Sequence, residues 1–275
     1  MRELRFDLNA MRERACVGVR RAAAFLGLSE RFMEGDLPRS LTLGNNVRRQ
    51  FLPDPYPDAH IPELRDSWRT WIVGNALREL DQFLSLYLDE AYDMVQQAKL
   101  VSGENPADHQ WKRIDRQTNV ADKHKLVVEQ TKRGTQVHLD DHQCLVSLSN
   151  ARNCLAHDLG IVTRKRAIDG ELRVRWLAVR MLIEQGDRVI DMDVAQFPIE
   201  LDPDGPAGVV IGKVEIAEKI FPMAGQIQFT PNELLEICFF YQLVIDRVAQ
   251  VVQEYAEECG VVFAQIETAK AEAAP

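Results

Sequence analysis

The strongest constraint on the fold is a run of apolar residues that recurs at intervals of three and four, from about 63 to 99. Such spacing places the side chains along one face of an α-helix, and Pro62 suits its first turn. A helix of this length needs neighbours to cover its apolar stripe, so the chain is expected to form a helical bundle. The predicted stripe comprises Trp68, Trp71, Ile72, Ala76, Leu80, Phe83, Leu84, Tyr87, Ala91 and Val95.

Further helices are predicted on both sides of this one. The segment LNAMRERACVGVRRAAAFLGL has helical periodicity, and a short basic helix is expected over about 120–131. The next helix is expected to begin with Asp140 or Asp141 as N-cap and to stop at Gly160. The last follows TPNE, in which Thr230 is the N-cap and Glu233 completes a capping box. The helix that ends before Gly160 is predicted to bury Cys144, Leu145, Leu148, Ala151 and Leu155.

Beyond Gly160 the apolar period changes to two, which is typical of β-strands. ELRVRWLAVRML and DRVIDM, joined by Gly186-Asp187, predict a β-hairpin, and GVVIGKVEI predicts another strand. The expected fold is therefore mainly α, a helical bundle with a small β insertion before the last helix. The expected organisation is an N-terminal helical arm over 1–55, a helical domain over 56–265 with its insertion at about 163–228, and a disordered tail over 266–275.

Several functional classes are excluded by composition and motif. The N-terminal segment lacks the apolar core of a signal peptide, and LLEICFFYQLVI is too short and too charged in its surroundings to span a bilayer. We therefore expect a cytoplasmic protein with no membrane partner. The five scattered cysteines form no C-x-x-C pair, and reduced, buried thiols are expected. There is no Walker loop, dinucleotide fingerprint, nucleophile elbow or kinase motif, and no cofactor is predicted.

Charge is unevenly distributed along an acidic chain whose formal net charge is −9. Residues 184–275 contain 17 acidic and 5 basic side chains, a balance of −12. Residues 112–133 and 163–183 each carry a balance of +4, from 7 basic and 3 acidic residues and from 6 basic and 2 acidic residues, respectively. Screening confines such fields to about 8–10 Å, so these segments are either local anion-binding surfaces or ordinary solvated faces.

The stretch SLSNARNCLAHDLGIV lies between the two basic segments and carries the most chemistry. Asn153 and His157 are four residues apart and share a helix face, and Arg152 is expected to reach the same side. An imidazole can exchange a proton near neutral pH, and a guanidinium matches the geometry of phosphate oxygens. Alternatively, His157 interacts only with the carbonyl end of the helix, and Arg152 is a surface ion-pair partner.

The motif R-N-C-L-A-H-D-L-G-I-V at the end of a bundle helix resembles that of the HEPN superfamily (higher eukaryotes and prokaryotes nucleotide-binding domain). The resemblance covers about residues 62–162 and the last helix. It implies a homodimeric, metal-independent endoribonuclease of the toxin or phage-defence kind, with an antitoxin protein as a further partner. His157 would then be the acid and base, Arg152 the phosphate ligand and Asn153 their support. The alternative is a non-catalytic helical module that binds a partner protein or a nucleotide.

Two secondary sites are also suggested by the sequence. Trp111 would offer a stacking surface for RNA beside a basic face, although a solvated helix face explains the same charges equally well. In HLDDHQC, His138, His142 and Cys144 suggest a metal site only if His138 is helical, and the expected cap at Asp140 argues against one. The predicted RNA-binding residues are Lys112, Arg113, Arg116, Lys123 and Lys125, with Lys132 and Arg133 on the same segment.

Overall fold

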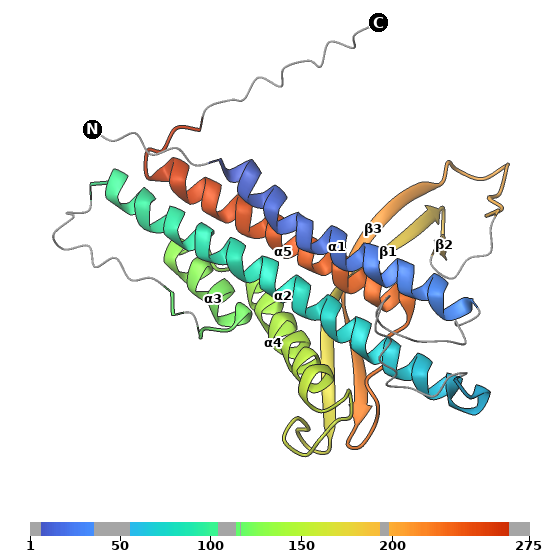
Figure 1. Ribbon diagram of the computed structural model, residues 1–275. Helices are drawn as coiled ribbons and strands as arrows, with labels where there is room; N and C mark the ends of the chain where they lie inside the picture. Colours follow the sequence, from blue (N-terminus) through green and yellow to red (C-terminus); the bar gives the residue numbers. More distant parts are fainter. Residues whose placement is uncertain (1–6, 36–55, 104–113, 116, 193–197, 264–275) are drawn as a thin grey trace, which may run out of the picture.

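The computed structural model shown in Figure 1 describes residues 7–35, 56–103, 114–115, 117–192 and 198–263. It is mainly helical, with a small antiparallel sheet before the last helix, and so confirms the predicted fold class at that level. The predicted tail over 266–275 lies outside the described residues. Among the helices of the described residues, none combines the length and the apolarity needed to cross a membrane.

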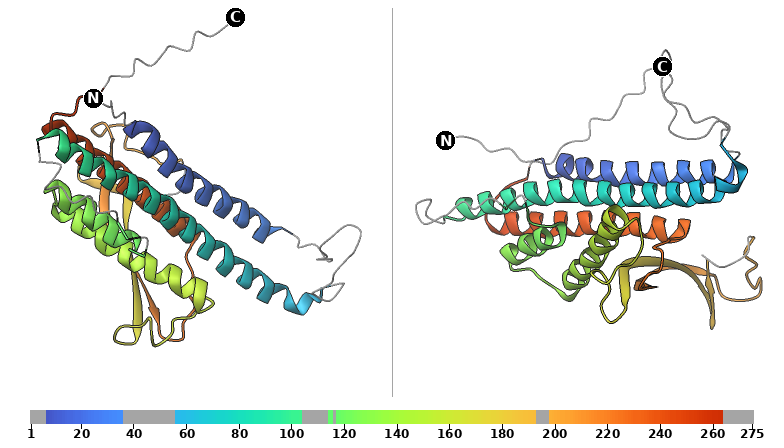
Figure 2. Two further views of the ribbon diagram at one scale, coloured as in Figure 1. Left: turned by 60° about the vertical axis from the view of Figure 1, so that its left-hand side comes forward. Right: turned by 60° about the horizontal axis from the view of Figure 1, so that its bottom comes forward.

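Three long helices run side by side and form the body of the bundle, as both views of Figure 2 show. The N-terminal helix packs against the other two, and its Met11 and Ala15 share one hydrophobic core with Leu84 and Val248. It therefore belongs to the same packed unit as the rest of the chain. The three helices are α1 (Leu8–Glu34), α2 (Ile61–Val101) and α5 (Pro231–Glu258).

Most of the predicted stripe of α2 is confirmed; the exceptions are Trp68 and Trp71 at its beginning and Phe83 farther along, which is only partly buried. Ile72, Ala76, Leu80, Leu84, Tyr87, Ala91 and Val95 are buried as predicted. Trp68 is partly exposed, whereas Trp71 has 58% of its surface exposed. The prediction for Trp71 was wrong because this residue lies at the rim of a groove between α2 and α4 rather than under another helix.

The close approach of α1 and α2 depends on Gly18. A Cβ atom at this position would lie 2.4 Å from Cβ of Phe83, which is too short for any real contact. We expect Gly18→Ala to lower the free energy of unfolding by about 1–3 kcal/mol through overpacking, although alanine favours the helix. Gly27→Ala is the matched control, because a Cβ there meets nothing within 4 Å, and it should stabilise the helix by about 0.5–1 kcal/mol. Urea unfolding of both variants measures the difference, and a stable Gly18→Ala would contradict this packing.

Two shorter helices cover another side of α2 and α5. The helix α3 (Val120–Thr131) has the bounds predicted for it. The helix α4 (Gln136–His157) begins earlier than expected, because Thr135 is its N-cap and forms a capping box with His138. The predicted cap at Asp140 or Asp141 was therefore wrong. Asp141 is instead fully buried and accepts a hydrogen bond from Nη1 of Arg247 at 2.6 Å.

The sheet has the strand order β2-β1-β3 and is antiparallel throughout. Its strands are β1 (Glu171–Gln185), β2 (Arg188–Asp191) and β3 (Val209–Pro222), and Gly186 adopts positive φ at the predicted hairpin turn. Trp176 is buried and donates a hydrogen bond from Nε1 to Glu236 of α5 at 2.8 Å. Ser147 of α4 accepts from the backbone N–H of Arg175 at 2.8 Å and donates to its carbonyl at 3.0 Å. The sheet is thereby fastened to the bundle through α4 and α5 (Figure 1).

Candidate functional site

The end of α4 is fixed by local backbone hydrogen bonds. The N–H groups of Asp158 and Gly160 both donate to the carbonyl of Cys154, at 2.9 and 3.1 Å. Leu159 and Gly160 then adopt positive φ of 54° and 77°, the left-handed conformation typical of a helix stop. His157 is consequently the last helical residue, and its side chain is exposed.

Arg152 turns toward α2, into the bundle. Its Nε lies 3.2 Å from Oδ2 of Asp81, which makes an ion pair although the N–H is not aligned for a hydrogen bond. Asp81 is buried and also accepts hydrogen bonds from the Tyr241 hydroxyl at 2.6 Å and the Ser149 hydroxyl at 3.4 Å. The side chain of Arg152 retains 28% exposure, so its guanidinium lies at the edge of the bundle.

The protonation of Asp81 is governed by opposing effects. Burial raises the pKa of its carboxyl group, while the Tyr241 hydroxyl and the Arg152 guanidinium act to lower that pKa. Burial and the neighbouring carboxylate also raise the pKa of Tyr241 well above its ordinary value. The tyrosine is therefore a hydrogen-bond donor at neutral pH, and it stabilises the charged form of Asp81 against its desolvation.

Asn153 and His157 lie on a different side of α4 from Arg152. His157 lies five positions after Arg152, a rotation of about 140° around the helix axis. Asn153 is half-buried, and the side chains of Asn153 and His157 have no hydrogen-bond partner among the described residues. The structure of one chain therefore brings Asn153 and His157 together, but it does not place Arg152 on their side.

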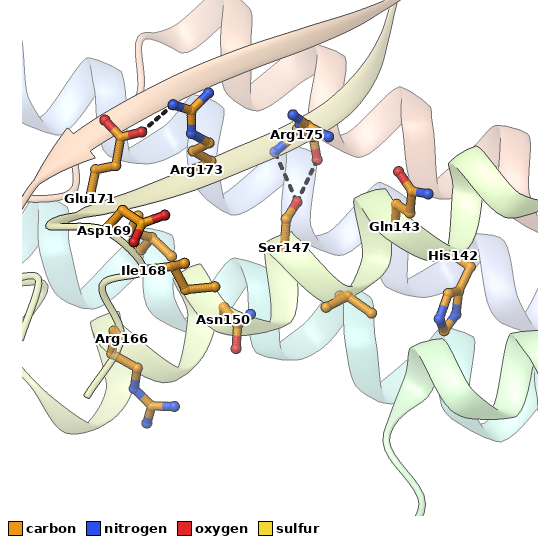
Figure 3. Close-up of a pocket in the computed structure, with 12 residues that line it drawn as sticks. His142, Gln143, Ser147, Asn150, Arg166, Ile168, Asp169, Glu171, Arg173 and Arg175 are labelled. Carbon is orange, nitrogen blue, oxygen red and sulfur yellow. Dashed lines mark hydrogen bonds and ion pairs between the residues drawn. The ribbon is translucent and has the colours of Figure 1, made fainter. Parts of the chain in front are cut away.

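A groove of about 570 Å³ runs between α4 and β1 (the α4–β1 groove; Figure 3). Asn150 lines it and lies on the same face of α4 as Asn153 and His157, at helical spacing. The arginines of this groove are already paired: Arg173 and Arg175 share Glu218, and Arg166 binds Asp158 with its Nε at 3.2 Å from Oδ2. The positive charges of the groove are thus largely compensated within the chain.

The predicted basic face divides into parts with different surroundings. Lys123 is buried, and its Nζ donates a 2.6 Å hydrogen bond to Asp89, which argues against contact with RNA. Lys125 is exposed, with its Nζ 3.8 Å from Glu129. Lys132 is exposed, whereas Arg133 is paired with Glu254, its Nη1 lying 2.6 Å from Oε2. Trp111, Lys112, Arg113 and Arg116 lie outside the described residues.

The histidines near the start of α4 do not assemble a metal site. His138 is helical after all, but Nδ1 of His142 contacts the carbonyl of Ala121 at 3.0 Å. Burial raises the pKa of the Cys144 thiol to about 12, which disfavours the thiolate that binds metals. No group of three histidine, cysteine or acidic side chains in the described part of the chain is arranged to hold a metal ion.

A buried histidine close by makes stability dependent on pH. His124 of α3 is fully buried, its ring nitrogens have no hydrogen-bond partner among the described residues, and burial lowers its pKa to about 3. The unfolded chain, in which histidine titrates near 6.5, binds this proton more readily, so stability is lost as the pH falls from about 6.5 toward 3. We expect wild type to lose about 1 kcal/mol more per pH unit than His124→Leu in that interval. Urea unfolding between pH 4 and 7 tests this, and parallel curves would contradict it.

No protein-family model matches this chain, and the searches of curated proteins and of solved structures found no match either. The likeness to the HEPN superfamily therefore rests on the motif from Arg152 to His157 and on its place at the end of a bundle helix. The sequence did not reveal the buried partners of Arg152. One signal was present, because Asp81 is an acidic residue at helical spacing between Leu77 and Leu84, where an apolar side chain is the rule.

Proposed function

We propose that this protein is a metal-independent endoribonuclease of the HEPN kind that acts as a homodimer. In this proposal His157 transfers the protons and Arg152 binds the scissile phosphate. Asn153 orients His157 or donates a hydrogen bond to the same phosphate. The ribose 2′-OH attacks the adjacent phosphorus, the bond to the 5′ oxygen of the next nucleotide breaks, and a 2′,3′-cyclic phosphate remains. The reaction consumes no co-reactant, because the proton removed from the 2′-OH is balanced by the one given to the leaving 5′ oxygen.

The observation that carries the proposal is the exposure of His157 at the last residue of α4, with Asn153 one turn before it on the same face. A general acid–base group must reach its substrate, and a histidine inside the core would have no such access. The loop that follows α4 adds positive charge, since Arg164 and Lys165 are exposed and have no ion-pair partner among the described residues. A local field of this kind attracts a polyanion even to an acidic protein.

A second chain is part of the proposal for a geometric reason. Within one chain, Arg152 and His157 point about 140° apart around α4, so they do not converge on one phosphate. One histidine also serves poorly as both base and acid in a single cleavage. A homodimer that apposes two α4 ends would supply a second His157 and a second Arg152 to one cleft.

The ion pair between Arg152 and Asp81 bears on the role of the arginine. A substrate phosphate would have to compete with the Asp81 carboxylate for the guanidinium of Arg152, whose side chain is only 28% exposed. Its Nε faces Asp81, and a guanidinium has five N–H donors, so donors remain for a phosphate. In this proposal Asp81 holds Arg152 in place while the other N–H groups bind the substrate.

The test is cleavage of a mixed RNA pool by the purified full-length protein in EDTA, with chemical analysis of the product ends. We expect cleavage products with 2′,3′-cyclic phosphate ends, and a cleavage rate that rises with the concentration of the dimer. A folded dimer that leaves RNA intact would refute it, as would products carrying 3′-hydroxyl and 5′-phosphate ends.

A second candidate function is a non-catalytic helical module that binds a partner protein or a nucleotide. The contact of Arg152 with Asp81 of its own chain favours it, because an arginine used in this way has a structural role. The two candidates differ in one measurement. Only the enzyme loses an RNA-cleaving activity when His157 is replaced.

A further inference from the structure

We infer that a second groove, between α2 and α4, binds an unpaired segment of single-stranded RNA, with the indole of Trp71 stacking on a base and Arg78 contacting a phosphate. This inference rests on the proposed function, since it gives the substrate a path beside His157. The groove has a volume of about 920 Å³. We call it the α2–α4 groove, lined by Thr70, Trp71, Asn75 and Arg78 of α2 and by Leu155 and Ala156 of α4.

The groove borders the motif directly. Its α4 wall is the last turn of that helix, where Leu155 and Ala156 immediately precede His157. Gly74 allows this approach, because a Cβ on it would already lie 3.2 Å from Cβ of Leu155. Figure 1 shows the end of α4 beside the first half of α2. A strand in the groove would therefore pass within a helical turn of His157.

Trp71 provides a rigid aromatic surface at the rim. Its ring stacks on Trp68 with a centroid separation of 5.4 Å and an interplanar angle of 27°. Trp68 is held in turn, because its Nε1 donates to the Ser29 hydroxyl at 2.9 Å and its ring packs against Phe32 at 5.5 Å. Trp71 nevertheless keeps 58% of its surface exposed. Because Trp68 already holds the indole of Trp71 in place, little conformational entropy is lost when a base stacks on its exposed surface.

Polar groups for a nucleotide follow along the same face of α2. Asn75 lies one turn after Trp71 and donates from Nδ2 to the Trp71 carbonyl at 2.7 Å, which orients its amide. Arg78 lies two turns after Trp71, is exposed, and has no ion-pair partner among the described residues. Trp71 and Arg78 are therefore about 10 Å apart along the helix axis, a distance that suits a short segment of single-stranded RNA better than a single nucleotide.

The charged residues of the α2–α4 groove indicate at which of its ends the phosphates of a bound RNA would lie. Glu63 and Asp66 lie at the start of α2, so that end repels phosphate. Arg78 lies at the opposite end, near the site where Arg152 meets Asp81. The phosphates of a bound strand therefore belong at the Arg78 end, with a base reaching back to Trp71.

The test is the affinity of the full-length protein for a labelled 12-nucleotide 2′-O-methyl RNA, measured by fluorescence anisotropy. This probe lacks the nucleophilic hydroxyl, so binding is measured without cleavage. Trp71→Ala is expected to weaken binding by a factor of about 5 to 100, whereas Trp71→Phe retains a stacking ring and should lose less. Arg78→Ala should reduce the salt dependence by about 0.7 in the log–log slope, the value for one phosphate of a single strand. A duplex of the same sequence should bind less well, because its bases are already stacked.

Phe25→Ala is the matched control, since Phe25 is also an exposed aromatic residue but belongs to α1 and does not line the groove. Unchanged affinity of Trp71→Ala, an equal loss in Phe25→Ala, or no saturable binding by wild type would each overturn the inference. Cleavage of unmodified RNA is measured in parallel. If the protein cleaves RNA but Trp71→Ala binds the probe as tightly as wild type, the groove is not the RNA-binding site, and the proposed endoribonuclease activity is unaffected. Trp71-dependent binding without cleavage would support the groove as a single-strand site and refute the proposed activity.

Discussion

Replacement of His157 by alanine is expected to lower the rate of RNA cleavage by a factor of about 10² to 10⁴, the range for loss of a positioned acid–base group. The side chain is exposed at the end of α4 and supports no part of the core. Its removal should therefore change the free energy of unfolding by no more than about 0.5 kcal/mol. Single-turnover cleavage of a labelled RNA in EDTA, with urea unfolding of the same preparation, measures both quantities.

The matched control is His60→Ala, because His60 is also an exposed histidine but precedes α2 and is not part of the α4 motif. This control should cleave at the rate of wild type. If His157→Ala cleaves as fast as wild type, the imidazole takes no part in the reaction. In that case R-N-C-L-A-H marks only the end of a helix, and the module function becomes the better account.

Replacement of Asp81 by alanine is expected to lower the free energy of unfolding by about 3–5 kcal/mol, as is usual when one partner of a buried ion pair is removed. The change leaves the guanidinium of Arg152 without its counter-charge and the Tyr241 hydroxyl without its acceptor. The Tyr241 hydroxyl is buried between α2, α4 and α5, where water does not readily replace the lost carboxylate. The urea midpoint measures the effect, provided that the slope of the transition stays constant.

Two further variants separate the causes of this effect. Asp81→Asn keeps the shape and an acceptor oxygen, so it should cost less than Asp81→Ala. Glu13→Ala removes a partner of the exposed ion pair with Arg20, and such pairs contribute only about 0–1 kcal/mol. If Asp81→Ala is as mild as Glu13→Ala, the buried cluster does not hold the three helices together.

Much of the secondary structure was predictable because it depends on neighbours in sequence. The helix bounds of α3, the capping box from Thr230 to Glu233 and the hairpin turn at Gly186 all follow from interactions within a few residues. The cap of α4 was missed for a local reason. Its capping box uses His138 where glutamate or glutamine is usual, so the stronger signal of two aspartates prevailed.

The candidate site was predictable in its residues but not in its geometry. The sequence placed Asn153 and His157 on one helix face, and periodicity alone determines that relation. It also allowed Arg152 to reach the same side, because a long side chain can turn either way. Asp81, Ser149 and Tyr241 decided its direction, and two of these lie on other helices.

The sequence by itself determined a mainly helical chain with a β insertion, the stripe that α4 buries, and a histidine at the end of that helix. These properties follow from local periodicity and from backbone groups that must be satisfied at helix ends. Only the tertiary structure decided that Arg152 meets a buried carboxylate and that Trp71 remains exposed above a groove. The reason is that burial and pairing depend on helices far apart in the chain, whose mutual placement no local pattern records.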